Sequence, residues 1–238
     1  MLVIGAGALG SAALFYLAAA GTGTIGIADF DNVELHNLQR QIIHRTSSVG
    51  KPKVFSAQET LQDVNPDIRI VCHNEKMTVD NIQSVLAKYD FVLDCTDRFE
   101  TKFLINDACV LSKKPYVHAG VVRFEGQVMT YVPGKGPCLR CLLGDVPPHE
   151  ATLTCSQAGV LGAVTGVIGS IQALEAVKFL LGKGDLLVGR VLRFDGLKMD
   201  MHVTSFSVPD PDCAVCGCAP RITSLVENRK NYEEACGG

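Results

Sequence analysis

The sequence predicts an α/β protein with a doubly wound, mostly parallel sheet and antiparallel strands toward its C-terminus. Two observations support this fold class. Short apolar strand segments alternate with helical segments along the chain, and a glycine-rich turn joins the first strand segment to the first helical one. A hydrophobic content of 47% with 20% charged residues fits a globular protein with a full core.

The expected elements follow from apolar segments bounded by turn residues. Strands are expected over residues 2–4, 24–28, 68–72, 91–94, 116–119, 127–132, 191–194 and 201–206, and the strand 127–132 is expected to be antiparallel. Helices are expected over residues 8–20, 53–64, 81–88, 99–111 and 157–181, and a long loop over 133–156. Asn65-Pro66 ends the second helix and Gly182 ends the last.

The last expected helix contains four glycines on one face, because their spacing is three, four and three residues. They are Gly159, Gly162, Gly166 and Gly169. Each glycine costs a helix interior about 1 kcal/mol relative to alanine, so a close neighbour is expected on that face. The neighbour is either another part of the chain or a second subunit.

Composition limits the function classes. The 238 residues are expected to form a single domain, 1–238, and a net charge of −3 argues against a nucleic-acid partner. The uncharged segment 158–171 is shorter than the roughly 20 residues of a membrane span, so we expect a buried helix and no membrane. Ten cysteines without a signal peptide indicate a reducing cytoplasm.

A nucleotide site is predicted at the first strand-to-helix turn, Gly5-x-Gly7-x-x-Gly10, which is typical of a Rossmann-like fold. Glycines permit a tight turn, and the helix N-terminus offers free N–H groups to a phosphate. Asp29 lies 19 residues after Gly10 at the end of the second strand, where a carboxylate can bind ribose hydroxyls. The alternative is a glycine turn without a ligand.

Two cations are expected beside this turn. Asn37 and Arg40 are three residues apart, so one helical turn directs both to the same point, and Lys53 opens the next helix. Arg40 and Lys53 could neutralise a triphosphate and a departing pyrophosphate. The alternative is a solvated surface pair.

Asp97 follows the buried strand that ends at Asp94. Ligands of open α/β sheets bind at the carboxyl ends of strands, so Asp97 is a candidate to hold Mg²⁺ on the phosphates. It also precedes a helix, and N-capping of that helix is its alternative role.

Two Cys-x-x-Cys pairs predict a structural zinc site with the ligands Cys138, Cys141, Cys213 and Cys216. A redox dithiol is the alternative. Cys155 precedes the last helix, where a helix N-terminus lowers a thiol pKa, so it could attack an acyl group. The alternative is an ordinary loop cysteine.

Taken together, the motifs resemble those of the ThiF/MoeB/HesA adenylyltransferases, relatives of the ubiquitin-activating enzymes. They are Gly5-Ala-Gly7-Ala-Leu-Gly10, Asp29-Phe-Asp31, Asn37-Leu-Gln-Arg40-Gln41, Lys53, Cys95-Thr96-Asp97 and the two cysteine pairs. The resemblance covers nearly the whole chain, and we expect the family's N-terminal helical segment to be missing from it. Arg98 and Lys102 stand where the family pattern has asparagine and arginine.

The resemblance implies that ATP adenylates the C-terminal Gly-Gly carboxylate of a ubiquitin-like sulfur-carrier protein, for thiamin or molybdopterin biosynthesis. It implies a nucleotide and Mg²⁺ site made of Gly5, Gly7, Gly10, Asp29, Asp31, Asn37, Arg40, Gln41, Lys53 and Asp97. Zinc on the four cysteines, a reactive Cys155 and a homodimer are further implications. The alternatives are an NAD-dependent oxidoreductase with a structural zinc and a non-catalytic scaffold that binds a carrier.

Overall fold

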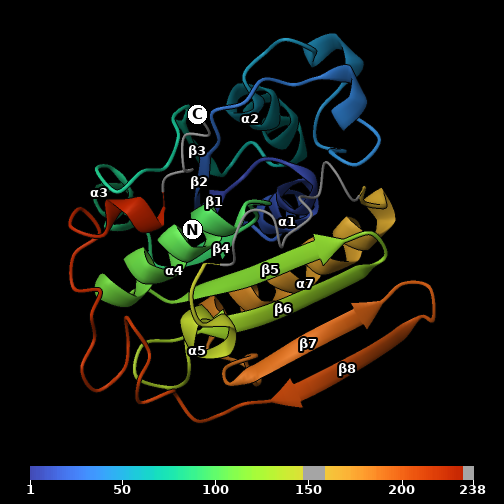
Figure 1. The fold of residues 1–238 in the computed structure, drawn as a ribbon. Coiled ribbons are helices and arrows are strands. Elements are labelled where there is room, and N and C mark those ends of the chain that lie inside the picture. The colour runs from blue at the N-terminus through green and yellow to red at the C-terminus, as the bar shows by residue number, and fades with distance from the viewer. Residues whose placement is uncertain (147–158, 233–238) are drawn as a thin grey trace, which may run out of the picture.

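The computed structural model describes residues 1–146 and 159–232, and all its named strands join one eight-stranded sheet (Figure 1). The strand order is β3-β2-β1-β4-β5-β6-β7-β8. The strands are β1 Leu2–Ile4, β2 Thr24–Ala28, β3 Arg69–His73, β4 Val92–Asp94, β5 Tyr116–Val122, β6 Glu125–Tyr131, β7 Arg190–Asp195 and β8 Asp200–Ser205. Strands β1 to β5 pair in parallel, and β6, β7 and β8 pair antiparallel, which confirms the predicted fold class.

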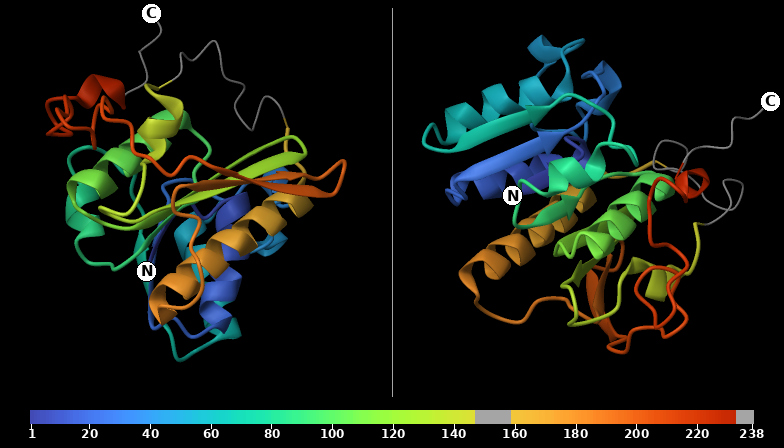
Figure 2. Two further views of the ribbon diagram at one scale, coloured as in Figure 1. Left: turned by 90° about the horizontal axis from the view of Figure 1, so that it is seen from below. Right: turned by 90° about the vertical axis from the view of Figure 1, so that its left-hand side faces the viewer.

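Helices cover both faces of the sheet (Figure 2). They are α1 Ala8–Ala19, α2 Lys53–Val64, α3 Ile82–Leu86, α4 Phe99–Leu111, α5 Leu139–Leu143 and α7 Gly162–Leu181. One core cluster joins α1, α2 and α7 to one sheet face, and a second joins α3 and α4 to the other. The C-terminal segment also packs into the second cluster through residues such as Leu225 and Tyr232.

The strand order reverses between β1 and β4. Chain connections leave the C-terminal ends of these neighbouring strands in opposite directions, which opens a crevice where ligands of such sheets bind. Strands β1 and β4 are buried along their whole length, as the continuous apolar sequences Leu2–Ile4 and Val92–Asp94 allow for central parallel strands.

Two expectations for the second half of the chain were wrong in detail. The expected loop 133–156 contains the short helix α5, which begins directly after Cys138. Helix α7 begins at Gly162, and Gly159 lies outside it with a φ of +74°, so three glycines and not four share the helix. Gly182 ends α7 in the left-handed conformation, as predicted.

Helix α7 is long and apolar enough to cross a membrane by length and composition alone. Its polar side chains nevertheless point into the protein. Gln172 and Glu175 are buried, and the Gln172 amide donates to the carbonyl oxygen of Asp94 at 2.8 Å. The helix is therefore part of the core, packed against α1, β5 and β6.

Candidate active site and metal centre

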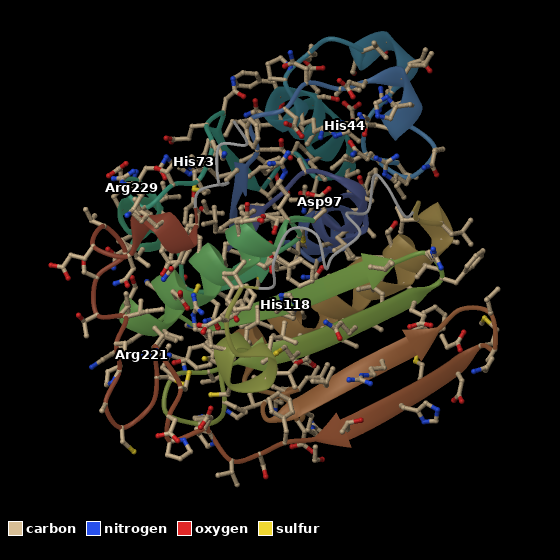
Figure 3. All side chains as sticks on the ribbon, viewed as in Figure 1. His44, His73, Asp97, His118, Arg221 and Arg229 are labelled. Atoms are coloured by element: carbon tan, nitrogen blue, oxygen red, sulfur yellow. The ribbon has the colours of Figure 1, made fainter. Side chains whose placement is uncertain are left out.

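A cavity of about 990 Å³ lies at the C-terminal ends of β1, β2, β4 and β5, where the strand order reverses. Its walls bring together side chains that are far apart in sequence, including Asp29, Arg40, Lys53, Asp97 and His118. Figure 3 labels Asp97 and His118. The cavity continues over the sheet to Arg193, Asp195 and His202 of β7 and β8. Its lining therefore extends from the glycine turn after β1 to the strands β7 and β8.

The turn between β1 and α1 requires glycine at two of its three positions. A Cβ on Gly5, whose φ is +101°, would lie 2.6 Å from the Cys95 carbonyl oxygen, and one on Gly10 would lie 2.0 Å from the Gly5 carbonyl oxygen. Gly7 has no such backbone neighbour and borders the cavity. Its bare backbone and the N-terminus of α1 are therefore open to an anion.

Hydrogen bonds of Asp29 connect this turn to the end of β2. Its carboxylate accepts hydrogen bonds from the amides of Ala6 at 2.8 Å and Asp31 at 2.9 Å. Burial raises the pKa of the Asp29 carboxyl, an effect that Lys53 and the two amides oppose. The Lys53 ammonium is itself buried and pairs with the Asp31 carboxylate at 2.8 Å, so the second expected cation is an ordered part of the site.

The segment around Arg40 is also ordered by hydrogen bonds. The Asn37 side-chain oxygen accepts from the Arg40 guanidinium at 3.2 Å and from the Gln41 amide at 3.0 Å. The Gln41 side-chain oxygen is buried, borders the cavity and has no hydrogen-bond partner among the described residues. A buried acceptor without a donor is costly, so the Gln41 oxygen is a site of local strain beside the cavity.

Asp97 is exposed and borders the cavity. Its alternative role as a helix cap was wrong, because Arg98 occupies the N-cap position of α4 and makes no side-chain capping bond. A carboxylate that faces the cavity without capping a helix is suited to a hard cation.

A buried charge network surrounds Asp94, three residues before Asp97. The Asp94 carboxylate accepts from the Thr96 hydroxyl at 2.7 Å, from Lys102 at 3.3 Å and from the His118 Nδ1 at 2.8 Å. Burial alone would raise the pKa of Asp94, but Lys102 and His118 outweigh it and lower that pKa to about 2. The bond to Thr96 fixes the loop that carries Asp97.

Four of the residues that shape the site were not predicted from the sequence. His44 contacts the Ala6 carbonyl oxygen at 2.9 Å, and Lys102, His118 and Gln172 surround the end of β4. Lys102 was noted only as a departure from the family pattern. A single histidine or glutamine in an apolar segment has no local pattern, so only the fold reveals these positions.

The two Cys-x-x-Cys pairs meet in space and form a candidate metal centre. The sulfur atoms of Cys138, Cys141, Cys213 and Cys216 all lie within 4.8 Å of one another, with separations such as 3.6 Å for Cys138–Cys213. Four thiolates about 2.3 Å from a tetrahedral zinc are about 3.8 Å apart. The cluster therefore fits a zinc ion, and its four-fold convergence favours a metal over the redox dithiol.

Arg140, between the first two cysteines, anchors this centre to helix α4. Its guanidinium makes paired hydrogen bonds with the buried Asp107 carboxylate, which also accepts from the Tyr232 hydroxyl at 2.7 Å. Paired arginine–carboxylate bonds fix both groups in one orientation. Cys155, by contrast, lies within 147–158, outside the described residues.

The ThiF family profile matches residues 1–215, and the chain therefore belongs to the ThiF family. Curated relatives from Culex quinquefasciatus and Aedes aegypti, each named adenylyltransferase and sulfurtransferase MOCS3, are 45% and 46% identical over 236 residues. The match covers 99% of this chain and 53% of each relative. The chain thus spans about half the length of the curated relatives it matches.

Among solved structures, E. coli MccB with ATP has a TM-score of 0.78 and 27% sequence identity, covering 91% of this chain and 65% of MccB. MccB with AMPCPP and MccA has a TM-score of 0.77 at the same identity and covers 66% of that chain. The fold is therefore shared with an enzyme that has been crystallised with a nucleotide.

Replacement of one metal ligand should destabilise the protein. We expect Cys213→Ser to lose bound zinc and to lower the melting temperature by about 5 °C or more, because metal binding stabilises only the folded chain. Metal content by mass spectrometry and thermal unfolding check this. Cys218→Ser, at an exposed cysteine of the same segment, should change neither, and an equal effect of both variants would contradict the assignment.

Acid should remove the stabilisation that Asp94 provides. Its pKa is about 2 in the folded chain against 3.8 in the reference state, so the unfolded chain binds more protons between these values and stability falls as pH falls. We expect a loss of about 1 kcal/mol between pH 5 and pH 3 that Asp94→Asn lacks. Urea unfolding at pH 5 and pH 3 measures the free energy of unfolding, and Asp67→Asn, at an exposed carboxylate, is the control. Equal losses in the wild type, Asp94→Asn and Asp67→Asn would refute the prediction.

Proposed function

We propose that this chain uses ATP to adenylate the C-terminal Gly-Gly carboxylate of a ubiquitin-like sulfur-carrier protein, with release of pyrophosphate. The observation that carries the proposal is one cavity that joins the glycine turn to Arg40, Lys53 and Asp97. The relatives named adenylyltransferase and the nucleotide-bound MccB structures support it. Thiamin or molybdopterin biosynthesis is the proposed pathway, and the cytoplasm the proposed location.

Different residues of the cavity would bind different parts of ATP. The N-terminus of α1 and the bare backbone at Gly7 receive phosphates, and the Asp29 carboxylate receives the ribose hydroxyls. Arg40 and Lys53 lie near the phosphates with Asn37 and Gln41 beside them, and the Asp31 carboxylate holds Lys53 toward the cavity. Asp97 would hold Mg²⁺, which neutralises phosphate charge when bound.

The chemistry needs alignment and charge neutralisation. A carrier carboxylate oxygen bonds to the α-phosphorus, and the bond from that phosphorus to the bridging oxygen of pyrophosphate breaks. Two anions repel each other in this step, and fixed cations in a partly buried site lower that barrier. No protein nucleophile is required, so Cys155 would act, if at all, after adenylation.

The extension of the cavity over β7 and β8 supports an extended peptide as second substrate. Gly120 of β5 and Gln127 of β6 border the cavity between its two ends, and a chain ending in two glycines is narrow enough to lie along them. An NAD-dependent oxidoreductase has no use for two cations at the phosphates, so the nucleotidyl transfer is preferred.

A homodimer is proposed from the outer surface of α1 and α7. Tyr16, Leu174 and Leu181 are 57% to 66% exposed there. Leu174 and Leu181 are seven residues apart and share one helix face. Exposed apolar side chains that gather on packed helices are typical of subunit contacts.

ATP–pyrophosphate exchange in the presence of a Gly-Gly-terminated carrier tests the function. We expect the wild type to show exchange and Arg40→Ala to lose about 10²- to 10³-fold, because a cation at the leaving pyrophosphate is removed. Arg45→Ala, at an exposed arginine of the same segment, and Cys155→Ser should stay within about twofold of the wild type. Absent exchange with carrier present, or NAD reduction instead, would overturn the proposal.

The dimer is tested by light scattering after gel filtration. We expect a mass of twice the 25.5 kDa of one chain, and a single-chain mass for the double variant Leu174→Glu, Leu181→Glu, since charges would be buried at the contact. Leu197→Glu, at an exposed leucine of the β7–β8 turn, is the control. A monomeric wild type refutes this contact.

A further inference from the structure

Helix α7 meets the Arg40 segment at a tight contact. A Cβ on Gly162 would lie 2.7 Å from the Gln39 carbonyl oxygen and 3.1 Å from the Arg40 Cα. Real Cβ atoms do not approach so closely, so a side chain at position 162 would have to displace that backbone or the helix. Glycine is therefore required here by its neighbour and not by its backbone conformation.

The helix is the less movable of the two partners. Gln172 donates to the carbonyl oxygen of Asp94, and the buried Glu175 carboxylate accepts from the Thr130 hydroxyl at 2.6 Å and from the Leu187 amide at 2.7 Å. Farther along, Gly169 packs against α1, where a Cβ would lie 2.4 Å from the Leu9 carbonyl oxygen. Added bulk at position 162 would move the Arg40 segment and leave α7 in place.

The segment that α7 contacts also contains Gln41, a second residue of the cavity wall. The Gln41 side-chain oxygen is buried and has no hydrogen-bond partner among the described residues. Gln41 is 5% exposed, so water does not readily replace the missing donor. The position of residues 39–41 therefore decides whether Arg40 and Gln41 reach one bound group together.

We propose that Gly162 is a positioning residue for nucleotidyl transfer. Because Gly162 has no side chain, α7 can pack closely against residues 39–41. The same helix contacts the first turn of α1 through Gly169, so α7 sets the distance between Arg40 and the N-terminus of α1. This inference rests on the proposed function of Arg40. A displacement of a few tenths of an ångström is enough to matter, because a 1 Å misplacement in an active site can cost about 10²-fold in rate.

Helix α7 provides a matched control in Gly166. Gly166 lies one turn from Gly162, and a Cβ there would have nothing within 4 Å. Both substitutions add one methyl group to α7, but Gly162 is the first residue of the helix and gains less helix propensity than Gly166 in the interior. A loss of exchange confined to Gly162→Ala is therefore assigned to the contact with the Arg40 segment.

The experiment compares ATP–pyrophosphate exchange and thermal unfolding for the wild type, Gly162→Ala and Gly166→Ala. We expect Gly162→Ala to fold with a melting temperature within about 4 °C of the wild type and to lose about tenfold in kcat. Gly166→Ala should retain wild-type exchange. A Gly162→Ala protein that is fully active, or that fails to fold, would overturn the inference. We expect the added methyl group to shift residues 39–41 and to leave the rest of the fold intact.

A double-mutant cycle separates positioning from general damage. In an Arg40→Ala background the guanidinium that the contact positions is gone, so Gly162→Ala should reduce the residual exchange by less than about twofold. An undiminished tenfold loss in that background would contradict the role of Arg40. A wild type without exchange refutes the proposed function itself, whereas an active wild type with an unaffected Gly162→Ala refutes only this inference.

Discussion

The site depends on how closely two loops pass at the centre of the sheet. The turn after β1 touches the chain after β4 at Gly5, where even a methyl group would collide with the Cys95 carbonyl oxygen. This contact places the N-terminus of α1 beside the loop of Asp97, although some ninety residues separate them in sequence. A bulkier turn would part the two loops, and the glycine turn and Asp97 would no longer share one cavity.

Charge below the cavity supports this arrangement. A carboxylate as deeply buried as that of Asp94 is stable only with partners, and Lys102 and His118 provide them. Its remaining acceptor positions bind Thr96. The hydrogen bonds that offset the burial of this charge therefore also hold the loop of Asp97 in one conformation. Lysine in place of the family's arginine at position 102 keeps the positive charge and reaches the Ala119 carbonyl oxygen as well.

Sequence reasoning predicted the fold class, the order of elements and the grouping of the motifs, because periodicity and glycine turns are local signals. Gly5, Asp29, Arg40, Lys53 and Asp97 border one cavity as expected, while their roles remain predictions. Helix α5 was missed because five residues give no periodic pattern. The network around Asp94 and the contact at Gly162 could not be foreseen, since both arise between segments far apart in the chain.

The cysteine cluster has one more physical consequence. Cys138 and Cys213 are 75 residues apart, and the stretch between them contains α7, β7 and β8. An ion on the four sulfurs would close this stretch into a ring, and ring closure of that length disfavours the unfolded chain by about 4 kcal/mol in the polymer description. Unlike a disulfide, such a cross-link forms without oxidation and dissolves when zinc is withdrawn. The lifetime of the folded chain would then follow the cell's supply of metal as well as its temperature.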